Sequence, residues 1–174
     1  MRLEEYSNVR HEYLDGQIYA MAGGTPEHGT YAANVIALLA SHLRGQPCRV
    51  QTSDVRIRVK ATGLVSYPDI SVVCGHAERD AEDPDAIVNP TLLVEVLSPS
   101  TEEYDRGEKL EHYKRIASLR EVVFVAHDEW RVDVLRRLNE EWELVTARRG
   151  ESARLDSVGC DLFVDEVYRD VLAR

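Results

Sequence analysis

The most restrictive feature of this sequence is a short apolar run that contains a single acid. Residues 92–97 read Leu-Leu-Val-Glu-Val-Leu, which has the length and the branching of a buried strand. Alternate side chains of a strand point to opposite faces, so neither register takes Glu95 away from apolar neighbours. A carboxylate is costly to bury unless it is paired, protonated or bound to a cation. The chain must therefore fold so that Glu95 receives a partner.

A second acid, Asp69, stands at the start of another buried strand, after Tyr67 and Pro68. Proline at this place suits the edge or the first residue of a strand. If the two strands pair, Asp69 and Glu95 converge, and each carboxylate raises the pKa of the other unless a divalent cation lies between them. Hard oxygen ligands of this kind favour Mg²⁺ or Mn²⁺ over zinc. The simpler interpretations are an arginine partner for Glu95 and a turn at Asp69.

The third candidate residue is Lys109. The segment DRGE at residues 105–108 has the D-x-x-E form of a capping box, which predicts a helix from here to about Ala117. A cation near a helix N-terminus opposes the macrodipole at a cost of up to about 1 kcal/mol. A lysine aimed at the two carboxylates would offset this cost and could orient a water or neutralise a phosphate oxygen. Alternatively, Lys109 lies along the surface, and Asp105 is more readily explained as a helix cap than as a ligand.

The remaining segments predict an α+β domain. Asp15-Gly16 between two strand-like runs indicates an N-terminal β-hairpin, and a helix over residues 26–44 begins with Thr25 as its N-cap. Three strands then follow at short spacing in the segments EVVFVAH, RVDVLRR and WELVTAR, and a short helix in DEVYRDVLAR closes the chain. We expect a mixed central β-sheet flanked by helices, in a single domain over residues 1–174.

Composition narrows the class of protein. The chain of 174 residues is 44% hydrophobic, which is enough for one real core. It has no apolar run near the roughly 20 residues of a membrane span, and its start lacks the apolar core of a signal peptide. We therefore expect a soluble, cytoplasmic protein without a membrane partner. The three cysteines are odd in number and far apart, so they indicate neither a disulfide framework nor a zinc ribbon, and we expect small core residues.

The charge argues against simple nucleic-acid binding. The net charge is −10, whereas a protein that holds DNA by phosphate contacts usually has a basic surface. Part of the acidity is local, in the loop HAERDAEDPD at residues 76–85. Arg56, Arg58 and Lys60 alternate with apolar residues along a predicted strand, and Arg106 flanks a predicted helix N-terminus. These residues are candidates for phosphate contact, although a solvated strand face explains the first three more simply.

Several motifs together resemble one known family. The chain carries in order PD (68–69), VEVLSPST (94–101), DRGEK (105–109) with Tyr113, and SLREVVFV (118–125), along with HEYLDGQIYAMAG, PEHG, SDVRIRV and DSVGCDLFVDEVY. In this order they resemble the Uma-two family of restriction-endonuclease-like proteins, within the PD-(D/E)XK nuclease superfamily. The resemblance implies a restriction-endonuclease-like core with a four-stranded mixed sheet, and Mg²⁺-dependent cleavage of phosphodiester bonds in DNA.

The resemblance also implies roles for individual residues. Asp69, Glu95 and the backbone carbonyl of Val96 would hold Mg²⁺ or Mn²⁺. The general motif has lysine two positions after the glutamate, where this chain has Leu97, so Lys109 would take over that role. The remaining candidates are His28 as a catalytic residue or a core histidine satisfied by hydrogen bonds, Tyr113 as a substrate contact or simply a core residue, and Glu12 and Asp105 with weaker claims.

Two interpretations of function stay open at this stage. The first is a Mg²⁺-dependent endodeoxyribonuclease, for which a homodimer is expected by analogy with small nucleases that cut both strands. The second is a catalytically inactive nuclease-fold module that binds a protein or a nucleic acid. The acidic net charge and the absence of lysine at position 97 both allow this second interpretation.

Overall fold

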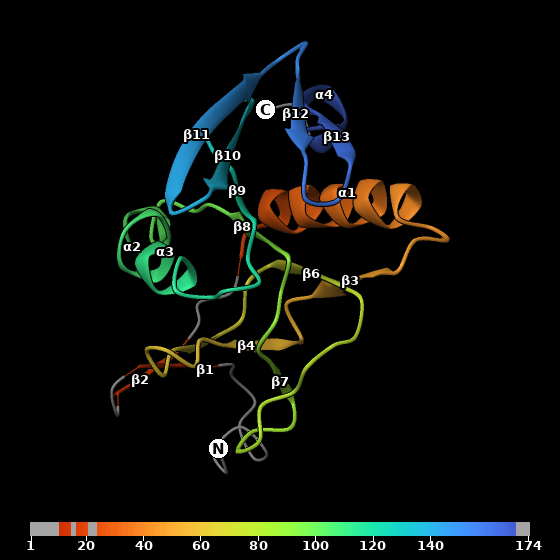
Figure 1. The fold of residues 1–174 in the computed structure, drawn as a ribbon. Helices are drawn as coiled ribbons and strands as arrows, with labels where there is room; N and C mark the ends of the chain where they lie inside the picture. Colours follow the sequence, from red (N-terminus) through yellow and green to blue (C-terminus); the bar gives the residue numbers. More distant parts are fainter. Residues whose placement is uncertain (1–10, 15–16, 21–23, 170–174) are drawn as a thin grey trace.

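The computed structural model describes residues 11–14, 17–20 and 24–169. Its centre is a six-stranded sheet with the order β11-β10-β9-β8-β6-β3 (Figure 1). These strands are β3 (Cys48–Thr52), β6 (Ile70–Cys74), β8 (Leu92–Val96), β9 (Glu121–Val125), β10 (Arg131–Leu138) and β11 (Glu141–Arg148). Only the pair β8–β9 is parallel, and the other neighbours are antiparallel. The sheet is therefore mixed, as the sequence predicts, but it has six strands rather than four.

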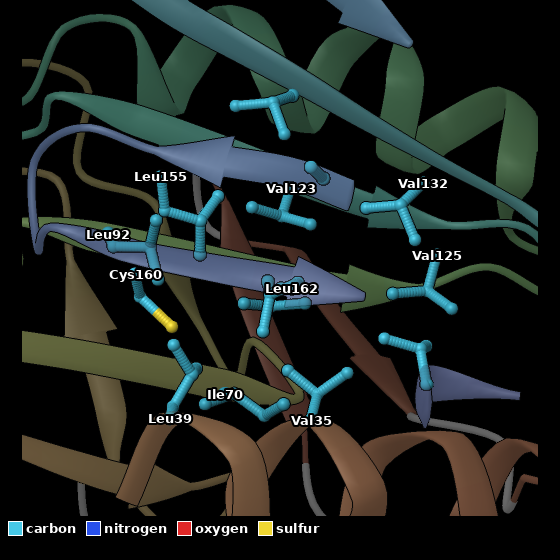
Figure 2. Close-up of a cluster of buried hydrophobic side chains, with 14 of the residues drawn as sticks. Val35, Leu39, Ile70, Leu92, Val123, Val125, Val132, Leu155, Cys160 and Leu162 are labelled. Carbon is cyan, nitrogen blue, oxygen red and sulfur yellow. The ribbon is translucent and has the colours of Figure 1, made fainter. Parts of the chain in front are cut away.

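Side chains alternate between two separate cores on the two faces of this sheet. Helix α1 (Pro26–His42) packs on one face, where Val35 and Leu39 join Leu92, Val94 and Val96 in one cluster (Figure 2). On the other face, residues of helix α3 (Glu108–Tyr113) and of the segment that follows it join Leu93, Val122 and Phe124. Strand β8 is buried on both faces because each face is covered by a helix. This explains why its sequence is apolar at every position except Glu95.

Helix α1 agrees closely with the predicted helix 26–44. The hydroxyl of Thr25, its N-cap, accepts a hydrogen bond from the backbone N–H of His28 at 3.3 Å. Pro26 occupies the first turn, where its missing N–H removes no helical hydrogen bond. The cap and the proline together set where the helix begins and hence where the side chain of His28 lies.

A second sheet lies beside the first and has the order β2-β1-β5-β4-β7. Its strands are β1 (His11–Leu14), β2 (Gln17–Ala20), β4 (Arg56–Arg58), β5 (Val65–Ser66) and β7 (Ala86–Ile87). Strands β1 and β2 form the predicted antiparallel hairpin, with Leu14 opposite Gln17. The predicted turn residues Asp15 and Gly16 lie outside the described residues. This sheet brings Glu12 and Ser66 to helix α3, where they lie near Lys109 and Tyr113.

The chain does not form one helix from the predicted capping box, because α2 (Glu102–Arg106) and α3 are separated at Gly107. The backbone N–H of Gly107 donates to the carbonyls of Glu103 and Tyr104, and a Cβ at this position would lie 2.7 Å from the carbonyl oxygen of Glu103. Asp105 is buried inside α2, and no side chain caps α3. The prediction of a capping box was therefore wrong, and Asp105 is not a helix cap.

The end of the chain packs on the α1 side of the sheet. The predicted strands β9, β10 and β11 form the antiparallel run, followed by the hairpin β12 (Ser152–Leu155) and β13 (Cys160–Phe163). The described part of the predicted final helix is the short α4 (Val164–Val167), and residues 170–174 lie outside the described residues. Among the described residues, no helix is both long enough and apolar enough to cross a membrane.

Two of the three cysteines are bonded to each other, which corrects the prediction made for them. Cys48 in β3 and Cys74 in β6 form a disulfide across 26 residues of sequence. The two residues are direct partners in the antiparallel ladder. Their distance in sequence conceals this contact because only strand pairing brings them together. Cys160 is free and buried, as expected for a small core residue.

Candidate active site

Strand pairing brings the two acids together. Strands β6 and β8 are antiparallel with Ile70 opposite Val94, so the same register places Asp69, just before β6, opposite Glu95. The Oδ2 atom of Asp69 accepts a hydrogen bond from the backbone N–H of Val96 at 2.8 Å. Asp69 is thereby attached to the strand that carries Glu95. The convergence that the sequence suggested for these two residues is present in the fold.

Glu95 lies inside the protein and has specific partners. Its Oε1 atom is 2.9 Å from Nζ of Lys109 and accepts a hydrogen bond from the hydroxyl of Tyr113 at 2.7 Å. Burial raises the pKa of Glu95 from 4.5 to about 8; Lys109 opposes this shift, while the negative charges of Asp105 and Asp69 add to it. Glu95 therefore lies in a site that contains more negative charge than its own cation balances.

Lys109 stands at the centre of three carboxylates. Its Nζ atom lies 2.9 Å from Glu95, 3.1 Å from Glu12 and 3.2 Å from Asp105. Burial alone would lower the pKa of the Lys109 amine. Its acidic neighbours, Glu95 above all, raise that pKa well above its ordinary value, so Lys109 is a cation. An ammonium has three N–H donors, and three carboxylates lie within reach of them. Glu12 and Asp105, which the sequence supported only weakly, thus contact the central lysine directly.

His28 approaches Asp69 from α1, on the more exposed side of the site. Its Nε2 atom is 3.4 Å from Oδ2 of Asp69, and about a fifth of each side chain is exposed, 22% and 19% respectively. The hydrogen bond to Asp69 raises the pKa of His28, burial lowers it, and the backbone carbonyl of Val96 raises it further. His28 and Asp69 therefore form the part of the site that solvent can reach, whereas Val96 is buried.

Tyr113 is fully buried, as its interpretation as a core residue predicts, and its contact with a substrate stays a prediction. Its hydroxyl donates to Glu95 and lies 3.0 Å from Oγ of Ser66 in β5. Burial raises the pKa of Tyr113 well above its ordinary value, and the neighbouring Glu95 adds to this. Tyr113 therefore holds Glu95 in place. Ser66 was missed by the sequence analysis, because a serine in a short strand carries no signal of its own.

The predicted phosphate-binding arginines are paired with acids of this chain. Arg56 contacts Asp83 at 2.7 Å and Asp85 at 3.3 Å, and Arg58 contacts Asp80 at 2.7 Å and Glu82 at 2.8 Å. The acidic loop noted in the sequence therefore folds onto the basic strand β4. Phosphate contact by Arg56 and Arg58 stays a prediction, and it would require phosphate to replace these carboxylates.

Arg106 is also engaged within the protein. It lies 2.6 Å from the buried Asp133 and 3.0 Å from Glu102, and its guanidinium stacks over the ring of Phe124. Arg106 therefore anchors α2 to strands β9 and β10. Its predicted contact with phosphate stays untested.

The donor set at Asp69 and Glu95 suits a hard divalent cation. Within residues 11–14, 17–20 and 24–169, no three His, Cys, Asp or Glu side chains are arranged to hold a metal ion by themselves. The predicted set is different, because it combines two carboxylates with the Val96 carbonyl. Burial raises the pKa of Glu95, and the negative charges of Asp105 and Asp69 raise it further, so a cation bound here would offset the repulsion among these acids.

Comparisons with known proteins agree with this fold. Residues 1–164 match the Uma2 family, described as "Putative restriction endonuclease". Two similar proteins of Synechocystis sp. are "Uncharacterized protein slr1290", 35% identical over 97% of this chain and 88% of that protein, and "Uncharacterized protein sll1609", 26% identical over 90% and 88%. A crystal structure of a putative nuclease belonging to DUF820 from Anabaena variabilis has a TM-score of 0.76 at 17% identity, over 93% of this chain and 91% of that one.

Proposed function

Because this chain belongs to the Uma2 family of restriction-endonuclease-like proteins, we propose that it is a metal-dependent nuclease that hydrolyses phosphodiester bonds of DNA. The observation that carries this proposal is the convergence of Asp69, Glu95 and Lys109 at the junction of β6, β8 and α3. Two acids and a lysine brought together in this way are the groups that metal-assisted phosphodiester hydrolysis requires.

Each residue of the site has a separate task in this proposal. Asp69, Glu95 and the Val96 carbonyl would hold Mg²⁺ or Mn²⁺. When bound, the ion would polarise the scissile phosphate and neutralise charge in the transition state. Asp69 is held in place by the Val96 N–H, and Glu95 by Tyr113 and Lys109.

Lys109 would orient the attacking water, but it has to release a carboxylate to do so. All three of its acidic partners lie within 3.2 Å. Glu12 is the weakest partner by geometry, since its Oε1 lies near the amine without a well-formed hydrogen bond. We therefore expect the N–H directed toward Glu12 to be the one that turns to the water.

Plasmid nicking tests the proposal. The purified protein should convert supercoiled DNA to the nicked or linear form in the presence of Mg²⁺ or Mn²⁺ and not in EDTA. Asp69→Asn, Glu95→Gln and Lys109→Met should each lower the rate roughly 100-fold or more, the size expected for lost electrostatic or general acid-base groups. Asp128→Asn, Glu143→Gln and Lys114→Met change comparable side chains in exposed or partly exposed positions and should cut at the original rate.

Two results would contradict the proposal. One is the absence of cleavage with either ion on double-stranded, single-stranded and RNA substrates. The other is cleavage that survives in both Asp69→Asn and Glu95→Gln, which would indicate a contaminating nuclease.

The second candidate function is a nuclease-fold module that binds without cleaving. It is favoured by the net charge of −10 and by the ion pairs that already occupy Arg56 and Arg58. Calorimetry separates the two candidates, because a module that has lost catalysis has no reason to bind millimolar Mg²⁺ or Mn²⁺ at Asp69.

Cleavage of both strands at one locus would need two active sites, so a homodimer remains part of the nuclease proposal. The predicted cytoplasmic location also remains a prediction. The disulfide between Cys48 and Cys74 bears against it, since reducing compartments seldom keep such bonds.

A further inference from the structure

Strand β11 is an open edge of the central sheet. It stands last in the order of the six strands, so its outer side meets no further strand of the described chain (Figure 1). It is eight residues long, whereas β3 at the opposite edge has five and is joined to β6 by the disulfide. Long edges pair readily with another strand, and many proteins prevent this with proline, lysine or a short edge. β11 has none of these three features.

The pairing of β10 shows which backbone groups of β11 point outward. The N–H of Arg137 donates to the carbonyl of Arg120, just before β9, so the odd-numbered residues of β10 bond toward β9. Its even-numbered residues therefore bond toward β11, where Val134 lies opposite Val145 and the other partners are likewise odd-numbered. The even-numbered residues of β11 direct their N–H and carbonyl groups to the open side. They include Trp142, Leu144 and Thr146.

The side chains of β11 make the strand complementary to a reversed copy of itself. Its centre is uncharged and exposed, since Leu144 is 57% and Val145 39% exposed on opposite faces. The charged residues divide by sign between the two ends, with Glu141 and Glu143 at the start and Arg148 and Arg149 at the end. Two such strands in antiparallel pairing bring the acidic end of each to the basic end of the other.

We infer that β11 pairs antiparallel with β11 of a second copy of this chain, around a two-fold axis at Val145. Opposite residues of an antiparallel pair direct their backbone groups alike, so even-numbered residues of one copy face even-numbered residues of the other. This register sets Leu144 opposite Thr146 of the second copy, and both contribute outward backbone groups. It sets Glu141 opposite Arg149 of the second copy, and the symmetry produces each pair twice.

The distribution of charge selects this register from its neighbours. With the axis at Leu144, Glu141 would lie opposite Ala147, and with the axis at Thr146 it would lie opposite Glu151, a like charge. Of the three registers, only the axis at Val145 gives Glu141 an arginine. The inference extends the homodimer of the proposed function and rests on that function only for the number of subunits, because the pairing itself follows from the edge strand.

Sedimentation velocity of the full-length protein in EDTA tests the pairing without measuring cleavage. A single strand pair is a small interface and two copies with a net charge of −10 repel each other, so we expect a dissociation constant on the order of 1–100 µM. Leu144→Lys places a charge at the centre of the pair and should weaken the dimer roughly tenfold or more. Phe163→Lys makes the same kind of change on β13 at the same exposure of 57% and should leave the dimer unchanged.

An exchange of charges tests the register. Glu141→Arg and Arg149→Glu should each weaken the dimer roughly three- to tenfold, because each variant places like charges opposite each other twice. The double variant Glu141→Arg with Arg149→Glu restores opposite charges and should dimerise like the original protein. The two residues stand at opposite ends of one strand, roughly 25 Å apart, so they cannot compensate each other within a single chain.

Cross-linking tests the position of the axis. At Val145 the two copies form a pair without direct hydrogen bonds, with Cα atoms about 4.5 Å apart, which a disulfide can span. Val145→Cys should therefore give a disulfide-linked dimer under mild oxidation. Leu144→Cys should form such a dimer much more slowly, since the two copies of residue 144 are diagonal to each other and about 7–8 Å apart. The native cysteines do not compete, because Cys48 and Cys74 are bonded to each other and Cys160 is buried.

The outcomes separate this inference from the proposed function. A monomer at all concentrations up to about 500 µM would overturn the pairing and leave the metal-dependent nuclease intact as a nicking enzyme. A dimer that Leu144→Lys does not weaken, or that the exchange of charges does not restore, would overturn the pairing as well. A protein that dimerises as described and cleaves no substrate would support the pairing and contradict only the nuclease.

Discussion

Glu95 shows how much one residue depends on the balance of charge around it. Four carboxylates, from Glu12, Asp69, Glu95 and Asp105, act on one another in this site, and Lys109 is the permanent cation among them. Burial makes each unbalanced charge more costly than it would be in water. Glu95 responds by keeping its proton up to about pH 8 in the absence of a metal.

This raised pKa makes stability depend on pH. In the unfolded chain Glu95 loses its proton near its ordinary value of 4.5, whereas the folded protein holds the proton to about 8. The folded state therefore binds more protons in this window, and its free energy of unfolding falls as pH rises, by up to about 1.4 kcal/mol per pH unit. Glu95→Gln removes this dependence. The stability of the original protein relative to Glu95→Gln should be greatest at pH 5 and lowest at pH 8.5.

Urea unfolding in EDTA at several pH values measures this difference. Glu143→Gln, an exposed glutamate in β11, should show no change of relative stability with pH. A constant difference between Glu95→Gln and the original protein from pH 5 to 8.5 would mean that Glu95 is ionised throughout.

At the level of elements, the break between α2 and α3 is what directs both Asp105 and Lys109 into the site. Asp105 is the fourth residue of α2 and Lys109 the second of α3, and their side chains meet at 3.2 Å across the break. Gly107 permits the break because its Cα approaches the carbonyl of Glu103.

Alanine at Gly107, between α2 and α3, and alanine at Gly29, in α1, should have opposite effects on the free energy of unfolding. Gly107→Ala places a Cβ 2.7 Å from a backbone oxygen, so we expect a loss of roughly 1–3 kcal/mol in the free energy of unfolding. Gly29→Ala lies in the exposed face of α1 with nothing within 4 Å of the new Cβ, so it should gain roughly 0.5–1 kcal/mol. Chemical denaturation of both variants measures these changes. An unchanged free energy of unfolding in Gly107→Ala would show that the break between α2 and α3 adjusts to the added Cβ without cost.

The disulfide between β3 and β6 should stabilise the edge of the central sheet. Removing it with a reductant, or by Cys48→Ala with Cys74→Ala, should cost about 2–4 kcal/mol. The double variant should then melt at the same temperature with and without reductant. Thiol titration after unfolding should find one free cysteine, Cys160, in the oxidised protein. Three reactive thiols in that sample would contradict the bond.

For the whole molecule, the distribution of charge is more informative than the total of −10. The acidic loop between β6 and β7 neutralises Arg56 and Arg58, so the basic strand β4 presents little net charge to a nucleic acid. The loop thus works against nonspecific binding to phosphate. If Arg56 and Arg58 contact DNA, removal of the loop acids should strengthen that contact.

The double variant Glu82→Gln with Asp85→Asn tests this point, since these side chains are 78% and 82% exposed. In EDTA and low salt, we expect its affinity for a labelled duplex to rise roughly three- to tenfold, with a steeper loss as salt increases. Fluorescence anisotropy measures both effects. Asp161→Asn with Glu166→Gln makes the same change of net charge elsewhere and should raise affinity less. Equal effects of the two double variants would show that only net charge matters.

Local patterns in the sequence were sufficient to predict many of the strands, the start of the first helix and several residues of the site. The alternation and length of apolar runs predict β8, β9 and β10, and the Thr25–Pro26 pair predicts where α1 begins, because strand burial and helix caps involve neighbouring residues. The acid in the run at 92–97 also identified Glu95 as a residue that needs a partner. Asp69 and Lys109 were then found from their places at the start of a strand and of a helix, and His28 was suggested by the resemblance to the family.

Contacts between segments that are distant in the sequence became apparent only in the folded structure. The bond between Cys48 and Cys74, the hydrogen bonds from Ser66 through Tyr113 to Glu95, and the break at Gly107 all depend on which strands become neighbours and on how closely backbones approach. These are properties of register and packing in three dimensions, and residue types spaced along a chain do not encode them locally. The individual acids could be found from the sequence because burying a charge is costly wherever it happens; their shared lysine became apparent only once two sheets and two helices had packed around it.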